Sequence, residues 1–266
     1  MYFGEVIRSK DNPKIKLFRK LMSSKKERMR YKLFVLEGSR LVFDALKSGA
    51  AVRQIYFTES ALLRYCDIIE ENVSSDIRVN VISDDMGKYI SATENTQGVF
   101  AECSFSDNTS VAGHIKSRGR YAVLYKLQDP GNAGMIIRTA DALGLDGVIF
   151  CESCDVYNPK VVRATMGSMF RVPVFRDVNE DELFTELDNA AVKSYAAVVD
   201  SSACDVKTTD FSDGGAVFIG NEGNGLDADI TAKCSEKITI RMSGNTESLN
   251  AAMAAGIIMW ELMKSE

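Results

Sequence analysis

The sequence predicts an α/β protein built from two domains. Short apolar runs alternate with amphipathic helical segments along most of the 266 residues, a pattern typical of a mostly parallel sheet covered by helices. Three apolar runs in the second half lead into loops that carry Gly or Asn. Because parallel strands bring the loops at their carboxyl ends to one edge of a sheet, we expect a ligand site there.

The first domain begins with a helix that Asn12-Pro13 caps and starts, and that runs to about Arg30. Its strands are expected at 33–36, 52–57, 77–82 and 99–103, and its other helices at 40–47, 60–71 and 85–90. We therefore assign residues 1–30 to a basic helical arm and residues 31–104 to a compact α/β domain.

Residues 105–120 are polar and aperiodic, so we expect a linker, and residues 121–266 form the second domain. Its strands are expected at 121–124, 147–151, 195–199, 216–219 and 238–240, and its main helices at 135–143, 179–191 and 248–263. Gly144 is the expected C-terminal cap of the first of these helices. Asn179 and Glu182 resemble a capping box at the start of the second.

Charge is distributed unevenly along the chain. The whole chain has a net charge of −5, but residues 1–30 hold ten Lys and Arg against three acidic residues, which makes this arm +7 and the remainder −12. A basic arm on an acidic body indicates contact with a polyanion. A solvated helix face has the same composition and remains the alternative.

The cysteines and the apolar segments exclude several classes of protein. No apolar stretch is long enough to span a bilayer and the N-terminus lacks a signal-peptide core, so we expect a cytoplasmic protein with no membrane partner. The six cysteines are scattered, as in reduced proteins. Cys151 and Cys154 form a lone CxxC far in sequence from the only histidine, His114, so no metal is expected. A redox or metal centre at this CxxC is a minor alternative.

Three loops carry the residues best suited to binding. They are Asp129-Pro-Gly-Asn-Ala-Gly134 with Arg138, Phe218-Ile-Gly-Asn-Glu-Gly-Asn-Gly-Leu226, and Ile240-Arg-Met-Ser followed by Ser248-Leu-Asn250. None matches the phosphate-binding or dinucleotide-binding glycine patterns, which disfavours a triphosphate or dinucleotide ligand. Glycine lets a backbone approach a ligand closely, so three such loops together favour a built site over three ordinary turns.

In their order and spacing, Asn132-x-Gly134-x-x-x-Arg138, Gly220-x-Glu222-x-x-Gly225-Leu226 and Ser248-Leu-Asn250 resemble the three motifs of the SpoU/TrmH family. These are S-adenosylmethionine-dependent RNA ribose 2′-O-methyltransferases of the SPOUT superfamily. The segments 34–42 and 96–99 resemble the substrate-binding domain that often precedes the catalytic one. The resemblance implies a trefoil knot in a C-terminal SPOUT domain with a parallel sheet, a rare exception to unknotted topology, and a homodimer with sites near the subunit interface.

The resemblance also implies roles for single residues. S-adenosylmethionine would contact Gly220, Ile240 and Leu249, with Ile219, Met242 and Gly225 beside them. The catalytic residues would be Asn132, Arg138, Glu222, Ser248 and Asn250.

The family account places Arg138 at the ribose hydroxyl. Because arginine stays protonated in proteins, we expect it to stabilise the developing alkoxide or to clamp the neighbouring phosphate rather than to act as a base. An ion pair with Glu222 is the structural alternative.

Two functional alternatives stay open. The resemblance implies RNA as partner, with ribosomal RNA preferred over transfer RNA because of the front domain. The alternatives are the same chemistry on transfer RNA and a catalytically silent RNA-binding homologue.

One residue departs from the family pattern. Arg241 stands where the family usually has proline, which changes the rigid exit of the strand before it.

Overall fold

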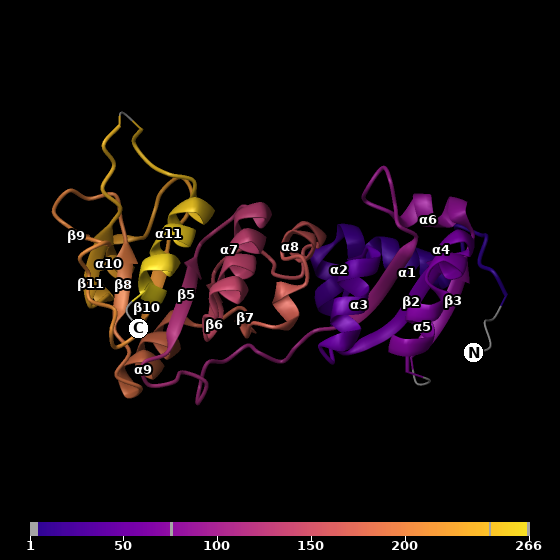
Figure 1. Ribbon diagram of the computed structural model, residues 1–266, viewed down its shortest axis with the longest axis horizontal. Coiled ribbons are helices and arrows are strands. Elements are labelled where there is room, and N and C mark those ends of the chain that lie inside the picture. The colour runs from indigo at the N-terminus through magenta and orange to yellow at the C-terminus, as the bar shows by residue number, and fades with distance from the viewer. Residues whose placement is uncertain (1–4, 75–76, 245, 265–266) are drawn as a thin grey trace. The chain divides into compact units, whose positions relative to one another are not determined.

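The computed structural model describes residues 5–74, 77–244 and 246–264. The chain folds into two compact units (Figure 1). Unit 1 consists of Met1–Ser106 and Tyr157–Phe170, and unit 2 of Asp107–Val156 and Arg171–Glu266. The chain therefore leaves unit 2 after Val156 and contributes one further segment to unit 1.

Unit 1 is built on a mixed sheet with the strand order β1-β4-β2-β3. β4 runs antiparallel to both of its neighbours, while β2 and β3 are parallel. Its elements are α1 Pro13–Ser23, α2 Lys25–Tyr31, β1 Leu33–Glu37, α3 Ser39–Lys47, β2 Val52–Thr58, α4 Glu59–Arg64, α5 Cys66–Asn72, β3 Arg78–Ile82, α6 Asp84–Ile90, β4 Val99–Ser104, α8 Pro159–Ala164 and the 3₁₀ helix η1 Ser168–Phe170.

The N-terminal helix is part of the core of unit 1. Its residues Ile15, Phe18 and Leu21 are buried against the sheet. The Phe18 ring packs edge-on against Tyr56 and Phe100, with centroid separations of 5.6 and 5.7 Å, a favoured geometry for aromatic pairs. The basic residues Lys16, Arg19 and Lys20 of this helix are therefore exposed on a folded unit, while Lys14 is half-buried.

The predicted continuous helix to about Arg30 is wrong, because the chain breaks it at Ser24. This residue is extended, and its hydroxyl accepts a hydrogen bond from the Glu27 amide at 3.3 Å, which caps α2. The buried Arg28 guanidinium donates to the Leu21 carbonyl oxygen at 2.6 Å near the end of α1. The helix expected at 60–71 is likewise split, into α4 and α5 at Tyr65.

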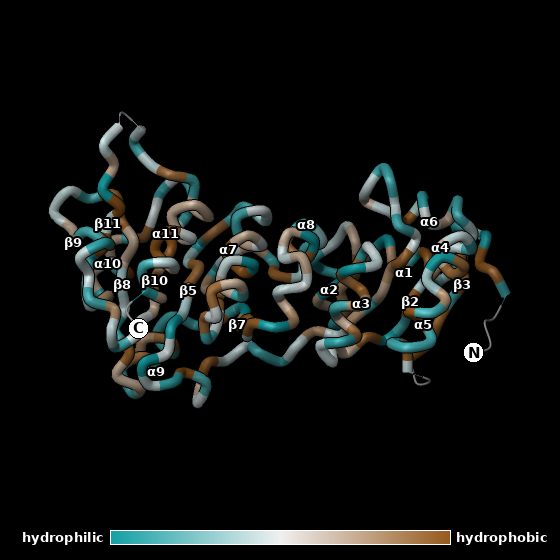
Figure 2. Tube along the Cα trace, viewed as in Figure 1, coloured by the Kyte–Doolittle hydropathy of each residue, from teal (hydrophilic) through white to brown (hydrophobic). Residues whose placement is uncertain are grey.

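Unit 2 contains a parallel sheet with the strand order β7-β6-β5-β10-β8-β11-β9. Its strands are mostly buried, and Figure 2 shows the hydrophobic stretch along β5. Its elements are β5 Arg120–Tyr125, α7 Pro130–Leu143, β6 Gly147–Cys151, β7 Val174–Phe175, α9 Glu180–Asn189, β8 Ser194–Ala197, β9 Cys204–Asp205, β10 Gly215–Ile219, α10 Ala228–Lys233, β11 Glu236–Thr239 and α11 Ala251–Lys264.

The strand order of unit 2 positions the three motif loops. β10 lies between β5 and β8, and β11 lies on the other side of β8. The carboxyl ends of β5, β10 and β11 therefore meet at one edge of the sheet, as expected for loops that share a site. α11 packs on α7, β5 and β10, which brings the third motif back to the first (Figure 1).

Segments outside the helices and strands are also fixed by burial and by hydrogen bonds. Val111, in the segment expected as a linker, is fully buried in the core of unit 2, and its amide donates to the Glu182 carboxylate at 2.9 Å. Asn179 accepts from the amides of Asp181 and Glu182, as expected of an N-cap. The Glu182 side chain thus holds the 110–111 segment rather than completing a capping box.

Candidate active site

The first motif forms the corner between β5 and α7. The Asp129 carboxylate accepts a hydrogen bond from the Asn132 amide at 2.8 Å and Pro130 occupies the first helical position, so the helix begins at Pro130 rather than at the predicted Met135. Asn132 is thereby fixed in the first turn, where it is buried. Gly144 ends the helix in the left-handed conformation, with φ +78°.

The second motif is a tight loop at the carboxyl end of β10. Asn221 and Gly225 exchange two backbone hydrogen bonds of 2.9 Å, and the Asn221 side chain accepts from the amide of Gly223 at 2.9 Å. A Cβ atom on Gly220 would lie 2.3 Å from the Gly225 carbonyl carbon and 2.5 Å from the Leu226 amide nitrogen. Only glycine fits at Gly220, because the loop folds back onto its backbone.

Hydrogen bonds join the three motifs through one chain of side chains. Asn132 Nδ2 donates to Glu222 Oε1 at 3.0 Å, and Asn250 Nδ2 donates to Asn132 Oδ1 at 2.9 Å. Asn250 Oδ1 in turn accepts from the amides of Ala252 and Met253 and caps α11. The helix therefore starts after Asn250 and not at the predicted Ser248, and these three candidate residues form one network.

Glu222 holds the backbone of the first motif. Its carboxylate accepts the amides of Gln128 and Asp129 at 3.1 and 2.9 Å in addition to Asn132. Partial burial raises the pKa of Glu222, but the hydrogen bonds from Asn132 and the two amides outweigh it, and the pKa is lowered below its usual range. The group is thus an ionised acceptor that fixes loop geometry rather than a proton donor.

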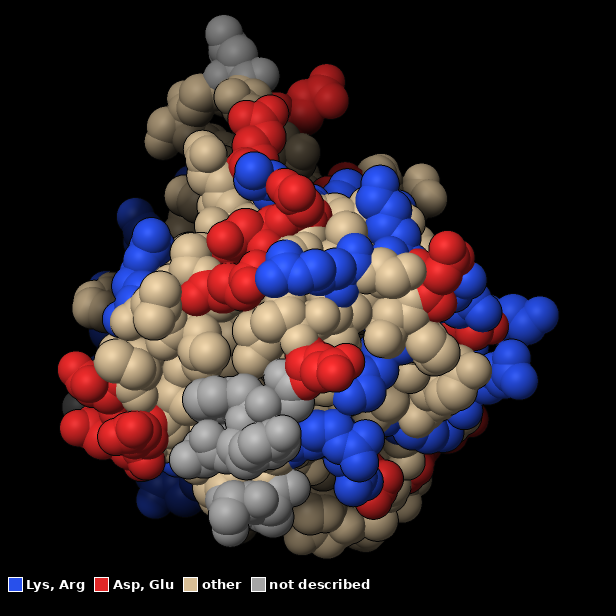
Figure 3. All heavy atoms as spheres, turned by 90° about the vertical axis from the view of Figure 1, so that its right-hand side faces the viewer, with Lys and Arg blue, Asp and Glu red and all other residues tan. Residues whose placement is uncertain are grey.

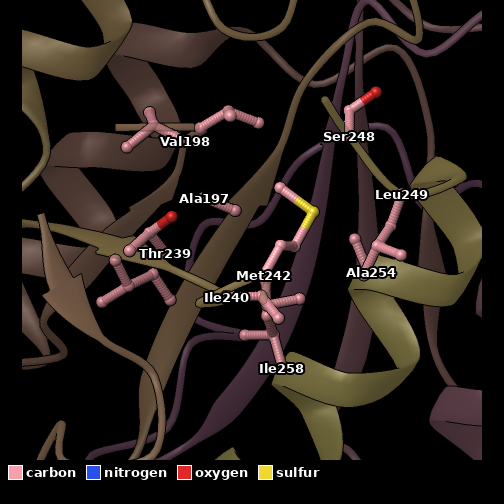
Figure 4. A pocket seen from close by; sticks show the side chains of 11 residues that line it. Ala197, Val198, Thr239, Ile240, Met242, Ser248, Leu249, Ala254 and Ile258 are labelled. Carbon is pink, nitrogen blue, oxygen red and sulfur yellow. The ribbon is translucent and has the colours of Figure 1, made fainter. Parts of the chain in front are cut away.

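An open cavity lies beside this network, at the carboxyl ends of β8 and β11 (Figure 4). Four predicted site residues line it: Ile240, Met242, Ser248 and Leu249. The Met242 side chain extends between Ala197 and Leu249. The lining is mostly apolar, as is typical of sites for small organic ligands.

Other predicted residues lie outside this cavity. Ile219 is buried at the end of β10, paired with Leu124, and Gly220 and Gly225 shape the loop that follows. Arg138 is exposed on α7, and within the described residues it forms no hydrogen bond or ion pair, with Glu222 or with any other group. The structure therefore does not contain the alternative pairing of Arg138 with Glu222.

Sequence reasoning missed one wall of the cavity. Ala197, Val198 and Val199 line it from the end of β8, and Ala254 and Ile258 line it from α11. A strand was expected at 195–199, but its position between β10 and β11 cannot be read from chain order. Val199 is 70% exposed and Leu249 39% exposed, so two large apolar side chains face an open cavity.

Cys151 is buried and Cys154 is half-buried, and neither thiol is reactive. Burial, with nearby acidic groups, raises the pKa of Cys151 to about 12 and that of Cys154 to about 11, so the reactive thiolate is disfavoured. The described residues contain no cluster of His, Cys, Asp and Glu suited to a metal ion. In the same part of the chain, every helix is too short or too polar to cross a membrane.

Two family models cover most of the chain. The SpoU rRNA Methylase family matches residues 119–260, and the MRM3-like substrate binding domain matches residues 12–101. Among curated proteins, the Bacillus subtilis 23S rRNA (guanosine(2553)-2′-O)-methyltransferase RlmP is 33% identical over 96% of this chain and 98% of its own length.

Solved structures agree with these matches. The AdoMet-bound rRNA methyltransferase from Sinorhizobium meliloti superimposes with a TM-score of 0.85 at 30% identity and covers 98% of both chains. The SpoU methyltransferase AviRb from Streptomyces viridochromogenes, in complex with AdoMet, gives a TM-score of 0.86 at 27% identity over 95% of this chain and 97% of its own.

The predicted α/β fold class, the family and the use of S-adenosylmethionine for RNA ribose 2′-O-methylation are confirmed by these matches. The chain belongs to the SpoU rRNA methylase family.

Proposed function

We propose that this chain methylates a ribose 2′-hydroxyl of ribosomal RNA in the cytoplasm. The observation that carries the proposal is the network of Asn132, Glu222 and Asn250, which assembles all three motifs beside an open apolar cavity. The Bacillus subtilis relative, named as a 23S rRNA enzyme, supports ribosomal RNA as the substrate. A Synechocystis relative is named as a tRNA/rRNA methyltransferase, which keeps transfer RNA as the second candidate.

The cavity is the proposed site of S-adenosylmethionine. Its exposed apolar groups, Val199 and Leu249, suit a flat nucleoside base, and the Ser248 side chain and the backbone at Ile240 are polar groups of its lining. When bound, the cofactor supplies an electrophilic methyl group. The chain's own contribution is a preformed pocket that holds the donor in one orientation.

Arg138 is the proposed group at the ribose. Its guanidinium is exposed and unpaired within the described residues, so it is free to meet an RNA phosphate or the developing alkoxide. Fixed positive charge at an oxygen that becomes anionic lowers the barrier more than it stabilises the ground state. Asn250, one helical turn from the cavity residue Ala254, would orient the hydroxyl.

Mapping of 2′-O-methyl groups in RNA tests the proposed function. Cells with and without the intact chain should differ at a ribose of ribosomal RNA, and the purified protein with labelled donor should restore the mark on RNA from the deleted strain. A mark that is lost only from transfer RNA would establish the second candidate. No difference in either RNA, with donor still bound, would indicate a catalytically silent homologue.

We also propose a homodimer formed through α7 and α11. Met253, Ile257 and Trp260 of α11 and Met135 of α7 are large apolar residues exposed at 37 to 56%. On α11 their spacing of four and three residues gives one stripe. Arg138 lies one turn from Met135, so the same surface carries the proposed catalytic cation, and pairing would bring it towards the partner's site.

Replacing Trp260 by Glu is expected to convert the dimer to a monomer, because a charge would be buried in the apolar stripe. Sedimentation velocity should show a fall from twice the chain mass of 29.3 kDa to that mass. Leu63→Glu is the matched control, since Leu63 is a still more exposed apolar residue in unit 1. A wild-type chain that sediments as a monomer at all accessible concentrations contradicts the proposal.

Unit 1 is the proposed RNA-binding part. The charged side chains on the face in Figure 3 are mixed in sign, so the binding cations are identified from their contacts. Two basic residues already have partners inside the unit: Arg28 donates to the Leu21 carbonyl oxygen, and Lys14 donates to the Asn80 side chain. Lys20, Lys25 and Lys26 are exposed and have no partner among the described residues, which leaves them available to phosphates.

Changing Lys20, Lys25 and Lys26 together to Gln is expected to weaken RNA binding and flatten its salt dependence. Each lost phosphate contact lowers the slope of log K against log salt by about 0.7 to 0.9. Lys47, Arg64 and Lys88, exposed cations on other helices of unit 1, form a control set with the same charge change. Equal effects of the two sets would show that RNA binding depends only on the net charge of unit 1.

Deleting residues 1–30 is a poor test of the same proposal. The deletion also removes the core residues Ile15, Phe18 and Leu21, so unit 1 would lose stability.

A further inference from the structure

The family resemblance implies a proline at position 241, and the Arg241 side chain that stands there makes specific contacts. Its guanidinium donates two hydrogen bonds, from Nη1 to the Ser201 carbonyl oxygen at 2.7 Å and from Nη2 to the Ala203 carbonyl oxygen at 3.0 Å. Both acceptors belong to the loop between β8 and β9. Hydrogen bonds from a charged donor are stronger than neutral ones, and a guanidinium that uses two nitrogens fixes direction as well as distance.

These contacts connect two walls of the proposed donor cavity. Val198 and Val199 line the cavity at the start of the loop, and Ile240 and Met242 line it on either side of Arg241. The last backbone hydrogen bond between the β8 chain and β11 before the loop runs from the Val198 amide to the Ile238 carbonyl, at 2.9 Å. Among the described residues no further backbone hydrogen bond joins these two walls, so Arg241 links segments that the sheet does not.

The loop has few other anchors. The Asp200 carboxylate accepts the amide and hydroxyl of Ser202 at 2.8 and 2.7 Å, which shapes the turn within the loop, and Lys237 and Arg241 attract its charge. The chain pairs with β11 again only at Cys204, which aligns with Ile238 on the side of β11 away from β8. Between Val198 and Cys204, the two bonds from Arg241 are the hydrogen bonds among the described residues that attach this loop to the exit of β11.

We propose that Arg241 is a positioning residue for the methyl donor. By holding the 199–203 loop against the exit of β11, it keeps Val198 and Val199 in place as a wall for the donor. A proline would stiffen this exit through the backbone, whereas Arg241 does so through its side chain. A wall that is already ordered avoids the entropic cost of ordering it upon binding. The inference rests on the assignment of this cavity to S-adenosylmethionine.

Arg241→Ala in the full-length protein tests the inference. The Kd and the KM for S-adenosylmethionine are expected to rise about tenfold, equivalent to ~1.4 kcal/mol, while kcat and the KM for RNA stay within about twofold of wild type. Arg241→Lys, which keeps the charge and can reach one carbonyl, should recover part of the donor affinity. The measurements are calorimetry with the donor alone and steady-state kinetics with each substrate varied.

Arg118→Ala is the matched control. Arg118 lies in the same unit and donates to a loop carbonyl, that of Ser212, at 2.8 Å, but it does not line the cavity. Its replacement should leave the donor Kd unchanged. Thermal unfolding of both variants shows whether either one disturbs the fold, and a donor defect common to both would overturn the inference.

Two further outcomes would overturn it. An unchanged donor Kd in Arg241→Ala shows that the loop needs no clamp, and a raised KM for RNA with an unchanged donor Kd shows that Arg241 contacts RNA instead. A second variant, Leu249→Ser, changes a residue that lines the cavity. It distinguishes a wrong role for Arg241 from a wrong assignment of the cavity to S-adenosylmethionine. If Leu249→Ser weakens donor binding and Arg241→Ala does not, only the clamp is wrong; if neither does, the assignment of the cavity is wrong.

Discussion

Replacing Arg138 by alanine is expected to lower kcat for methyl transfer about 10²- to 10³-fold, the cost of removing one fixed charge-stabilising group. The Kd for S-adenosylmethionine should change by less than about twofold, because the exposed Arg138 side chain does not line the proposed donor cavity. Stability should also be preserved, since within the described residues the side chain has no partner to lose. Single-turnover transfer of labelled methyl groups and calorimetry with the donor measure the two effects.

A second variant, Arg138→Lys, tests whether the charge alone or the shape of the guanidinium matters. It keeps a positive charge but loses the planar fork that binds two oxygens at once, so a large residual defect would favour a bidentate clamp on the RNA. A near-complete recovery would indicate that charge alone matters. If Arg138→Ala lost donor binding in proportion to turnover, its role would be architectural and our assignment would be wrong.

Gly220→Ala is expected to abolish tight donor binding and to destabilise unit 2. The new Cβ would lie between 2.3 and 2.5 Å from backbone atoms of Gly225 and Leu226, and backbone cannot rotate away as a side chain can. Overpacking of this kind costs about 1 to 3 kcal/mol. Because the displaced loop also carries Glu222, we expect donor affinity to fall at least about tenfold.

Gly223→Ala, in the same loop, controls for this experiment. Its new Cβ would meet only the Asn221 side-chain oxygen, at 3.6 Å, which is an ordinary contact. We therefore expect near wild-type unfolding and donor binding from this variant, as measured by thermal denaturation and calorimetry. Equal damage from both substitutions would show that the loop tolerates no side chain and that the close approach at Gly220 is not the cause.

Much of the fold could be predicted because its signals are local. The caps at Asn12, Asp129 and Asn179 and the glycine at 144 lie beside the elements they bound. Even so, the start of α7 was predicted five residues late, because Pro-Gly-Asn-Ala-Gly reads as a loop until the carboxylate of Asp129 is seen to cap it. The break at Ser24 was missed for a similar reason, since basic residues continue on both sides of it.

The candidate site was predicted less completely because it depends on distant contacts. The motifs identified Asn132, Glu222 and Asn250, but not that they bond to one another across 90 and 118 positions of sequence. The wall formed by Val198 and Val199 follows from the place of β8 in the sheet, which sequence order does not reveal. The trefoil knot stays a prediction of the family resemblance.

The return of Tyr157–Phe170 to unit 1 limits how the protein can be divided. The Tyr157 ring stacks on Phe105 and Phe34, with centroids 4.0 and 4.5 Å apart, and Val161 and Val162 are buried. A catalytic fragment cut after Ser106 would keep this segment but lose its packing partners, and would expose apolar surface prone to aggregation. Chimeras that exchange RNA specificity between relatives should therefore transplant two stretches of chain, the N-terminal one and this insert, as a single cassette.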